Sequence, residues 1–229
     1  MNILKKYPVA FLLLLCVLVS GCGRVFTPQE RSIITRSGDV MYVTTVNDPS
    51  DSVLLRRECR DLNPRELKST LFRELGRKML STVTSPQQDG VGIAAPQVGL
   101  NVRLVALQRL DKEGEPFELY PNIHILDYLG ETVYGPEGCL SVPSMRGIVP
   151  RREGVVVSFI DPEALRPVVD TVFGFTAVIF QHETDHLDGR LYTDLADSLF
   201  FNPSWDAERA PFAASGDYDK PSWWPMDIK

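Results

Sequence analysis

Residues 181–189, with the sequence QHETDHLDG, constrain this chain more than any other segment. They include two of its three histidines, His182 and His186. Because these are four positions apart, they lie on one face of a helix and can bind one metal ion together. Glu183 follows the first histidine, where a carboxylate can accept a proton from metal-bound water. The segment predicts a helix that carries a catalytic metal; the alternative is an ordinary helix with two surface histidines.

The residues around these histidines predict that the helix is buried. Phe175, Val178 and Ile179 place apolar side chains on the same helical side as the histidines. Gly189 is suited to end the helix, because glycine readily adopts the left-handed conformation found at helix C-termini. We expect a buried helix over about 174–188.

The size and composition of the chain favour one ordinary domain with appendages. A length of 229 residues is enough to bury a core, and 44% hydrophobic with 24% charged residues is typical of a folded protein. The formal net charge of -6 gives no support to nucleic-acid binding or to a polybasic membrane surface. We expect a monomer with no nucleic acid among its partners.

The N-terminus has the pattern of an export signal. Lys5 and Lys6 precede an apolar run of 11 residues, a length typical of a signal-peptide core and too short to cross a bilayer. The run ends in VSGC at 19–22, which resembles the lipobox of bacterial lipoproteins. We expect residues 1–21 to be removed and a lipid on Cys22 to anchor the exported protein in the cell envelope, facing the periplasm or the outside. The alternatives are a plain secretory signal cleaved nearby and an uncleaved anchor.

The two ends of the mature chain read as appendages. Residues 22–46 predict a linker or N-terminal extension, and the strand-like patch at 40–46 predicts an edge strand within it. Residues 198–229 lack periodicity and become rich in Pro, Ser, Asp and Trp, which predicts an irregular tail. Three tryptophans could pack this tail onto the domain: Trp205, Trp223 and Trp224.

Apolar spacing in the middle of the chain predicts strands between two helices. A polar cap and Pro64 start a helix near residue 61, and helical spacing continues it to about 81. Its apolar stripe, which we expect to be core, is Leu67, Leu71, Phe72, Leu75 and Met79. Further apolar segments predict strands at 102–107, 123–126 and 155–160. With the helix near 174–188, this order indicates an α+β fold.

Two histidines do not complete a catalytic metal site, so a third protein ligand is expected. The HExxHxxGxxH pattern of metzincin proteases fails, because Tyr192 stands where the third histidine belongs. Asp194, Asp197 and Glu208 are carboxylate alternatives, and no spacing favours any of them. The remaining candidate is Cys139, since thiolates bind transition metals strongly. Taken alone, this cysteine is more simply a small buried hydrophobic residue.

The cysteines of an exported protein meet an oxidising compartment. Once Cys16 is removed and Cys22 is acylated, Cys59 and Cys139 remain and could form one disulfide. We favour a free, buried Cys59.

Three segments stand together: GVGIAAPQVG at 90–99, EGCLS at 137–141 and QHETDHLDG at 181–189. In this order and at these intervals they resemble the peptide deformylases, with Ile93 where leucine is commoner. The resemblance covers residues 47–197. It implies a compact α+β fold with short antiparallel strands around a central HExxH helix. It also implies one divalent metal ion, iron(II), with zinc or nickel as alternatives, and its implied ligands are Cys139, His182 and His186.

The resemblance further implies the residues that act on the substrate, an N-formylmethionyl peptide. Glu183 is implied as the catalytic acid and base, and Gln97 and Leu140 as the groups that line the oxyanion site. Gly90 and Gly92 let the backbone approach the peptide, or simply form a tight turn.

Other residues carry weaker implications. Arg146 matches a position near the substrate channel of the family, with a solvated surface arginine as the alternative. Glu137 is expected to contact Arg103 or another basic group as support for a metal ligand. We treat His124 as structural.

We therefore expect an exported, lipid-anchored hydrolase that releases formate from formylated peptides. Export moves the protein away from the cytosol, where new chains begin with formylmethionine, so its chemistry is better constrained than its substrate. An oxidising compartment favours a redox-inert ion such as zinc over iron. The alternatives are a metallo-amidase or peptidase for another N-acyl peptide, and a lipoprotein that keeps this fold for binding without turnover.

Overall fold

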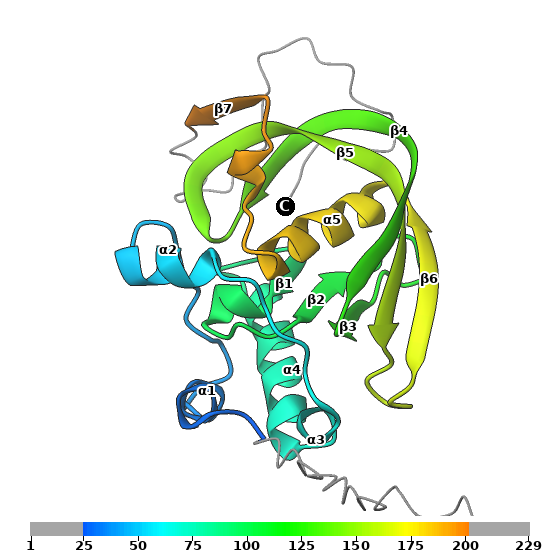
Figure 1. Ribbon diagram of the computed structural model, residues 1–229. Helices are drawn as coiled ribbons and strands as arrows, with labels where there is room; N and C mark the ends of the chain where they lie inside the picture. Colours follow the sequence, from blue (N-terminus) through cyan, green and yellow to red (C-terminus); the bar gives the residue numbers. More distant parts are fainter. Residues whose placement is uncertain (1–24, 202–229) are drawn as a thin grey trace, which may run out of the picture.

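Helix α5 (Phe175–Leu187) lies at the centre of the molecule, between two antiparallel sheets (Figure 1). The computed structural model describes residues 25–201. The larger sheet contains β4 (His124–Cys139), β5 (Val142–Ile160), β6 (Pro167–Phe173) and β7 (Ser198–Phe201). The smaller sheet contains β1 (Gly92–Ala94), β2 (Leu104–Gln108) and β3 (Phe117–Pro121), and helix α4 (Thr70–Val83) packs against it. The remaining elements are α1 (Pro28–Ile34), α2 (Pro49–Leu55), α3 (Pro64–Leu67) and the 3-10 helices η1 (Ala95–Val98) and η2 (Tyr192–Asp194). The predicted α+β fold with a central helix is confirmed.

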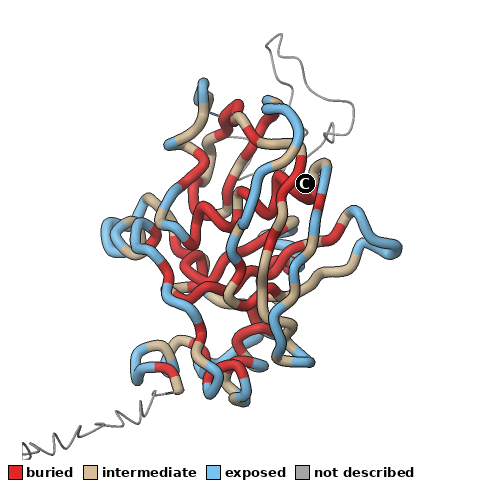
Figure 2. The backbone as a smooth tube through the Cα atoms, turned by 45° about the vertical axis from the view of Figure 1, so that its right-hand side comes forward, coloured by how far each residue is buried: buried red, intermediate tan, exposed pale blue. Residues whose placement is uncertain are grey.

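Strand β2 shows why the smaller sheet separates α4 from α5. Successive side chains of a strand point to opposite faces of its sheet. Leu104 and Ala106 belong to the core shared with α4, whereas Val105 and Leu107 belong to the core shared with α5. Both faces of this sheet are therefore buried, and Figure 2 shows the buried residues concentrated in the middle of the molecule.

The helix predicted over 61–81 is two helices, α3 and α4, divided at Lys68 and Ser69. The Ser69 hydroxyl oxygen accepts a hydrogen bond from the Phe72 amide at 3.1 Å and caps α4. The apolar stripe spans both helices, because its residues in α3 and α4 pack into the same core despite the break. Its core role is confirmed for four members, which are buried: Leu67, Phe72, Leu75 and Met79.

The expectation of short strands is wrong for β4 and β5, which form a hairpin of 16 and 19 residues. Their pairing shifts register between Leu129 and Thr132 and again between Glu137 and Cys139. Such bulges let a ribbon accommodate glycine and proline, which otherwise signal strand ends. The turn at 140–141 joins the two strands, so Cys139 is the last residue of β4.

The N-terminal extension belongs to the fold. Helix α1 packs against α4, and Ile34 and the preceding Phe26 are buried. The predicted edge strand at 40–46 is wrong, because this segment is extended without pairing to a strand. Its hydrogen bonds go to several separate elements instead.

The prediction of an irregular tail is wrong for residues 198–201, which form β7. This strand pairs with β5 from Met145↔Phe201 to Ile148↔Ser198. Trp205, Trp223 and Trp224 lie outside the described residues, and so does the predicted export signal with Cys22. Among the helices of residues 25–201, none has the length and apolar character needed to cross a membrane.

Candidate metal centre

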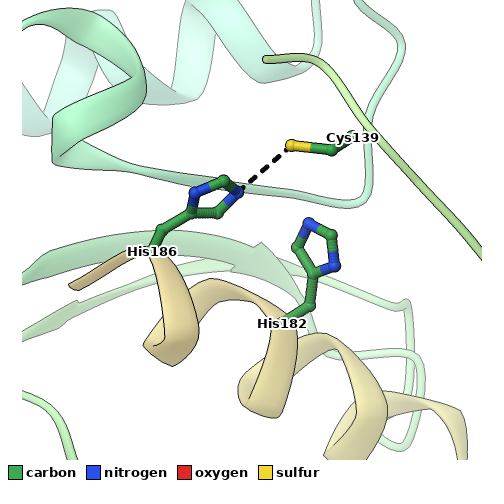
Figure 3. A group of neighbouring side chains, drawn as sticks. All are labelled: Cys139, His182 and His186. Atoms are coloured by element: carbon green, nitrogen blue, oxygen red, sulfur yellow. Dashed lines mark hydrogen bonds between the residues drawn. The ribbon is translucent and has the colours of Figure 1, made fainter. Parts of the chain in front are cut away.

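Cys139, His182 and His186 converge at the centre of the molecule (Figure 3). The histidines project from successive turns of α5, and Cys139 reaches them from the end of β4. Cys139 Sγ lies 3.2 Å from His186 Nε2, and one ligand atom from each residue lies within 4.8 Å of the others. Ligand atoms of a tetrahedral site with ordinary metal–sulfur and metal–nitrogen bonds are about 3.5 Å apart. The donor set and its spacing therefore fit a transition metal ion.

Two nitrogen donors face the sulfur of Cys139 besides the histidines. The Ser141 amide donates to Sγ at 3.4 Å, and the Gln97 side-chain amide donates at 3.5 Å. Both hydrogen bonds stabilise negative charge on the sulfur. The tight hairpin turn thus positions the cysteine and supplies a donor to it.

A buried ion-pair network orients His182. Its Nδ1 lies 2.7 Å from Glu137 Oε2, which leaves Nε2 available for a metal. Arg151 donates two hydrogen bonds to Glu137, at 2.7 and 3.0 Å, and a third to Asp185 at 2.5 Å. Burial alone would raise the pKa of Glu137, but Arg151 and His182 lower it to about 2. This carboxylate is therefore charged whenever the protein is folded near neutral pH.

The basic partner of Glu137 is Arg151, which confirms the predicted contact with a basic group other than Arg103. Arg103 donates instead to the Ile123 carbonyl and to Asp188. The long β4–β5 pairing brings Arg151 beside Glu137 from the neighbouring strand.

His186 has the electrostatic character of a neutral ligand. Burial, followed by the neighbouring His182, lowers the pKa of His186 well below its ordinary value. Neutral imidazole has the free lone pair that metal binding requires. Its Nδ1 makes no hydrogen bond within the described part of the chain.

Glu183 is buried beside the cluster, and its Oε2 makes no hydrogen bond to any described residue. Burial raises the pKa of Glu183 to about 7, and the charge of Glu137 adds to the increase. Gly92 leaves room for this carboxylate, because a Cβ there would lie 2.5 Å from Glu183 Oε1. A carboxyl group with this pKa and a free oxygen is suited to accept and return a proton near neutral pH.

Gln97 is held at both ends of its side-chain amide. Oε1 accepts a hydrogen bond from the Ala94 amide at 2.8 Å, which fixes the rotamer from within η1. Nε2 donates to Ser141 Oγ at 3.2 Å and to Cys139 Sγ. The Gln97 side-chain amide, predicted as an oxyanion donor, therefore lies next to the metal-ligand residues.

A cavity of about 70 Å³ opens beside these groups. Apolar side chains form much of its wall: Val91, Leu140, Phe175, Val178 and Ile179. Gly90 and Gly92 line it as well. The structure therefore brings the residues singled out in all three sequence segments to one cavity.

Arg146 also lines the cavity, and it is only 2% exposed, so the alternative of a solvated surface arginine is wrong. It lies over Gly138, where a Cβ would be 1.8 Å from Arg146 Nη1. Burial lowers the pKa of Arg146 to about 10, which leaves it charged near neutral pH.

Tyr192, which stands in place of the third histidine of the metzincin pattern, contacts a metal ligand in a different way. Its ring is buried and stacks on His182, with centroids 6.0 Å apart and planes at 22°. Its hydroxyl makes no hydrogen bond within residues 25–201. No local pattern signals this contact, because η2 brings Tyr192 back across the end of α5.

In the described part of the chain, Cys59, His124 and the carboxylates considered as alternative ligands do not belong to the metal-ligand cluster. Asp194 pairs with Arg56 and accepts from the Leu191 amide, and Glu208 lies outside the described residues. Among the described residues, Cys59 is a free, buried thiol, as expected, and Cys139 is also free of a disulfide. His124 lies 3.2 Å from Asp61 at the surface.

The comparisons with known proteins agree with this geometry. Residues 40–201 match the family model described as polypeptide deformylase. The peptide deformylase of Symbiobacterium thermophilum is 44% identical over 125 residues, which span 54% of this chain and 56% of that protein. That of Roseiflexus sp. is 30% identical over 184 residues, which span 75% of this chain and 97% of that protein. The solved structure of a class I type b peptide deformylase from Acinetobacter baumannii, with Met-Ala-Ser bound, has a TM-score of 0.60 and 32% identity, over 68% of this chain and 98% of that one. The chain therefore belongs to the peptide deformylase family of metal-dependent enzymes.

Proposed function

We propose that this protein hydrolyses the formyl group from N-formylmethionyl peptides and releases formate and a free amine. The observation that carries the proposal is the buried Glu183, whose Oε2 has no hydrogen-bond partner within residues 25–201 and lies beside the Cys139, His182 and His186 cluster. A proton acceptor next to a metal-binding site is the arrangement that metal-assisted hydrolysis of an amide requires.

Each residue around the cavity has a separate role in the proposed reaction. Glu183 accepts a proton from the attacking water and later donates it to the departing amine nitrogen. The Gln97 side-chain amide and the Leu140 backbone amide donate to the negative charge that develops on the formyl oxygen. Gly90 and Gly92 leave space for the peptide backbone, and Arg146 supplies positive charge near the substrate.

A divalent metal ion held by Cys139, His182 and His186 supplies Lewis acidity toward water and the formyl oxygen. The family resemblance implies iron(II). An oxidising compartment favours zinc, and nickel also suits this donor set. Elemental analysis of protein purified from its native compartment decides between these ions; iron without zinc would contradict the preference for zinc.

We further propose that the protein acts outside the cytoplasm as a lipoprotein, with residues 1–21 removed and Cys22 acylated. The support is the sequence pattern of the N-terminus alone. The full-length chain and its Cys22→Ser variant are expressed separately. Each is then analysed by membrane fractionation and intact-mass measurement. We expect only the former to gain the mass of acyl chains and to sediment with membranes.

The test of the chemistry is formate release from a formyl-Met peptide by residues 23–229. The protein is loaded anaerobically with iron(II), nickel or zinc, and Glu183→Ala is the control. Turnover that requires metal and disappears in Glu183→Ala supports the proposal. Folded, metal-loaded protein that is inactive with every ion contradicts it. A panel of N-acetyl peptides then tests the amidase alternative, and inactivity on the whole panel leaves the binding role.

A further inference from the structure

Residues 41–46 form an extended segment, here called the strap, that crosses several elements near the metal cluster. At its start, the Met41 amide donates to Thr82 Oγ1 of α4 at 2.9 Å. Near its end, the Thr45 amide donates to Asp51 Oδ2 of α2 at 3.1 Å. The strap is therefore fixed to two helices that take no part in the cluster.

Thr44 binds the strap to the turn that carries Gln97. Its amide donates to the Gln97 carbonyl at 2.9 Å, and its hydroxyl donates to the Pro96 carbonyl at 2.9 Å. The side chain is only 3% exposed, so water does not compete for these carbonyls. Two consecutive peptide groups of η1 are thus held by one residue.

Val46 binds the strap to the turn beyond Cys139. Its amide donates to the Ser141 carbonyl at 2.9 Å. Ser141 Oγ in turn receives the hydrogen bond of Gln97 Nε2. The strap and the two turns therefore form a closed ring, in which the Gln97 side chain is one member and Thr44 holds its backbone.

This ring fixes the direction of the Gln97 amide. An oxyanion donor is effective only when it is already aimed at the developing charge, and small displacements are costly. The Ala94 hydrogen bond fixes one end of the side chain. The Gly99 amide donates to the Pro96 carbonyl at 3.1 Å, and the remaining support of this backbone comes from contacts outside η1. Because Thr44 supplies two of those contacts, we infer that it is a positioning residue for Gln97. The inference rests on the proposed function for its effect on turnover.

Adjacent threonines give a matched test. Thr44→Val keeps the shape of the side chain and removes its hydroxyl, and Thr44→Ser keeps the hydroxyl. Thr45→Val is the control, because the Thr45 hydroxyl makes no hydrogen bond within residues 25–201 and its side chain is partly exposed. We expect kcat of Thr44→Val to fall about tenfold with KM within about twofold, since the donor acts in the transition state. Thr44→Ser and Thr45→Val should stay within about twofold of the wild type.

A second measurement does not depend on turnover. The side-chain amide of Gln97 is followed by NMR in the metal-free protein and identified by its absence in Gln97→Ala. We expect this signal to shift or broaden in Thr44→Val and to be retained in Thr44→Ser and Thr45→Val. An unchanged signal with unchanged kcat in Thr44→Val would overturn the inference. Wild-type protein that releases no formate would contradict the proposed function instead, and the amide signals would still decide the role of Thr44.

Discussion

Two clusters of charged residues lie along helix α5, one around the buried Arg109 and one around the buried Glu183, and they differ in how completely they are paired. Arg109 lies over the Phe180 ring and donates to Asp111 at 2.8 and 2.7 Å, and to Tyr120 and Asp170 at 2.9 Å each. All three nitrogens of its guanidinium are bound. Further along the helix, starting three residues after Phe180, Glu183 Oε2 and His186 Nδ1 have no partner among the described residues.

This difference separates a cluster that stabilises the fold from one that performs chemistry. A fully paired buried charge has nothing left to offer a ligand, and removing it leaves its partners unpaired. An unpaired buried carboxylate opposes folding, so its presence indicates a role that another residue cannot fill. Substitutions in the two clusters should therefore affect activity and stability in opposite proportions.

The largest effect is expected for Glu183→Gln. Because a neutral amide cannot accept the proton of water, formate release should fall by about 10²–10⁴-fold. The melting temperature of the metal-free protein should stay the same or rise, since an unpaired buried carboxylate is removed. Formate assays and thermal unfolding of the same preparation test this. A less stable protein that retained its activity would break the distinction between the clusters.

Arg109→Met should have the opposite result. The loss of Arg109 leaves Asp111 and Asp170 without their partner, but both carboxylates are about one third exposed, so we expect a loss of about 2 kcal/mol in the free energy of unfolding. The kcat of the folded fraction should change less than about twofold. Urea unfolding measures the first quantity. Lys112→Met, which removes an exposed ion pair with Glu118, is the control and should cost less than about 1 kcal/mol.

Glu137→Gln tests the support of a metal ligand. The amide retains the shape of the side chain but loses the charge that faces His182 and Arg151. Substitutions at such positions weaken metal binding by about 10–100-fold, and we expect a decrease in that range. Competition with a chelator of known affinity measures it. An affinity equal to that of the wild type would place Glu137 with the Arg109 cluster, as a group that serves stability alone.

The smallest effect concerns the pH dependence of the Arg109 cluster. Hydrogen bonds from Arg109 lower the pKa of Asp111 below its ordinary value of 3.8. A lowered folded-state pKa stabilises the protein above pH 3.8, and this contribution disappears as the pH falls through the folded-state value. The wild type should therefore exceed Asp111→Asn in unfolding free energy at neutral pH, by at most about 1 kcal/mol. The two should converge in acid, and a difference that grew in acid would contradict the assignment.

The sequence predicted the grouping of Cys139, His182 and His186 more closely than it predicted the lengths of the strands around them. His182, Glu183 and His186 could be placed together because their spacing within one helix fixes their geometry. Cys139 required the family resemblance, because no local rule relates position 139 to a helix 43 residues later. The length of β4 and β5 was missed, since Gly130 resembles a strand end until the register shift between Leu129 and Thr132 is known.

Residues that act through long-range contacts were not predictable in the same way. The strap has no periodicity, and its polar backbone groups gave no indication that Thr44 would reach the Pro96 carbonyl. Arg151 was missed as the partner of Glu137 because strand register decides that contact. Tyr192 was assessed only against a metal-ligand pattern, which says nothing about aromatic stacking on His182.

The layered arrangement of the fold also separates the point of attachment from the reaction. The described chain begins at Val25, which packs into the core beside α4, whereas the cavity lies by α5 on the other face of the smaller sheet (Figure 1). The proposed lipid on Cys22 would stand three residues before Val25 in the sequence. The enzyme would sample peptide ends that reach it through water, within the short radius its tether allows.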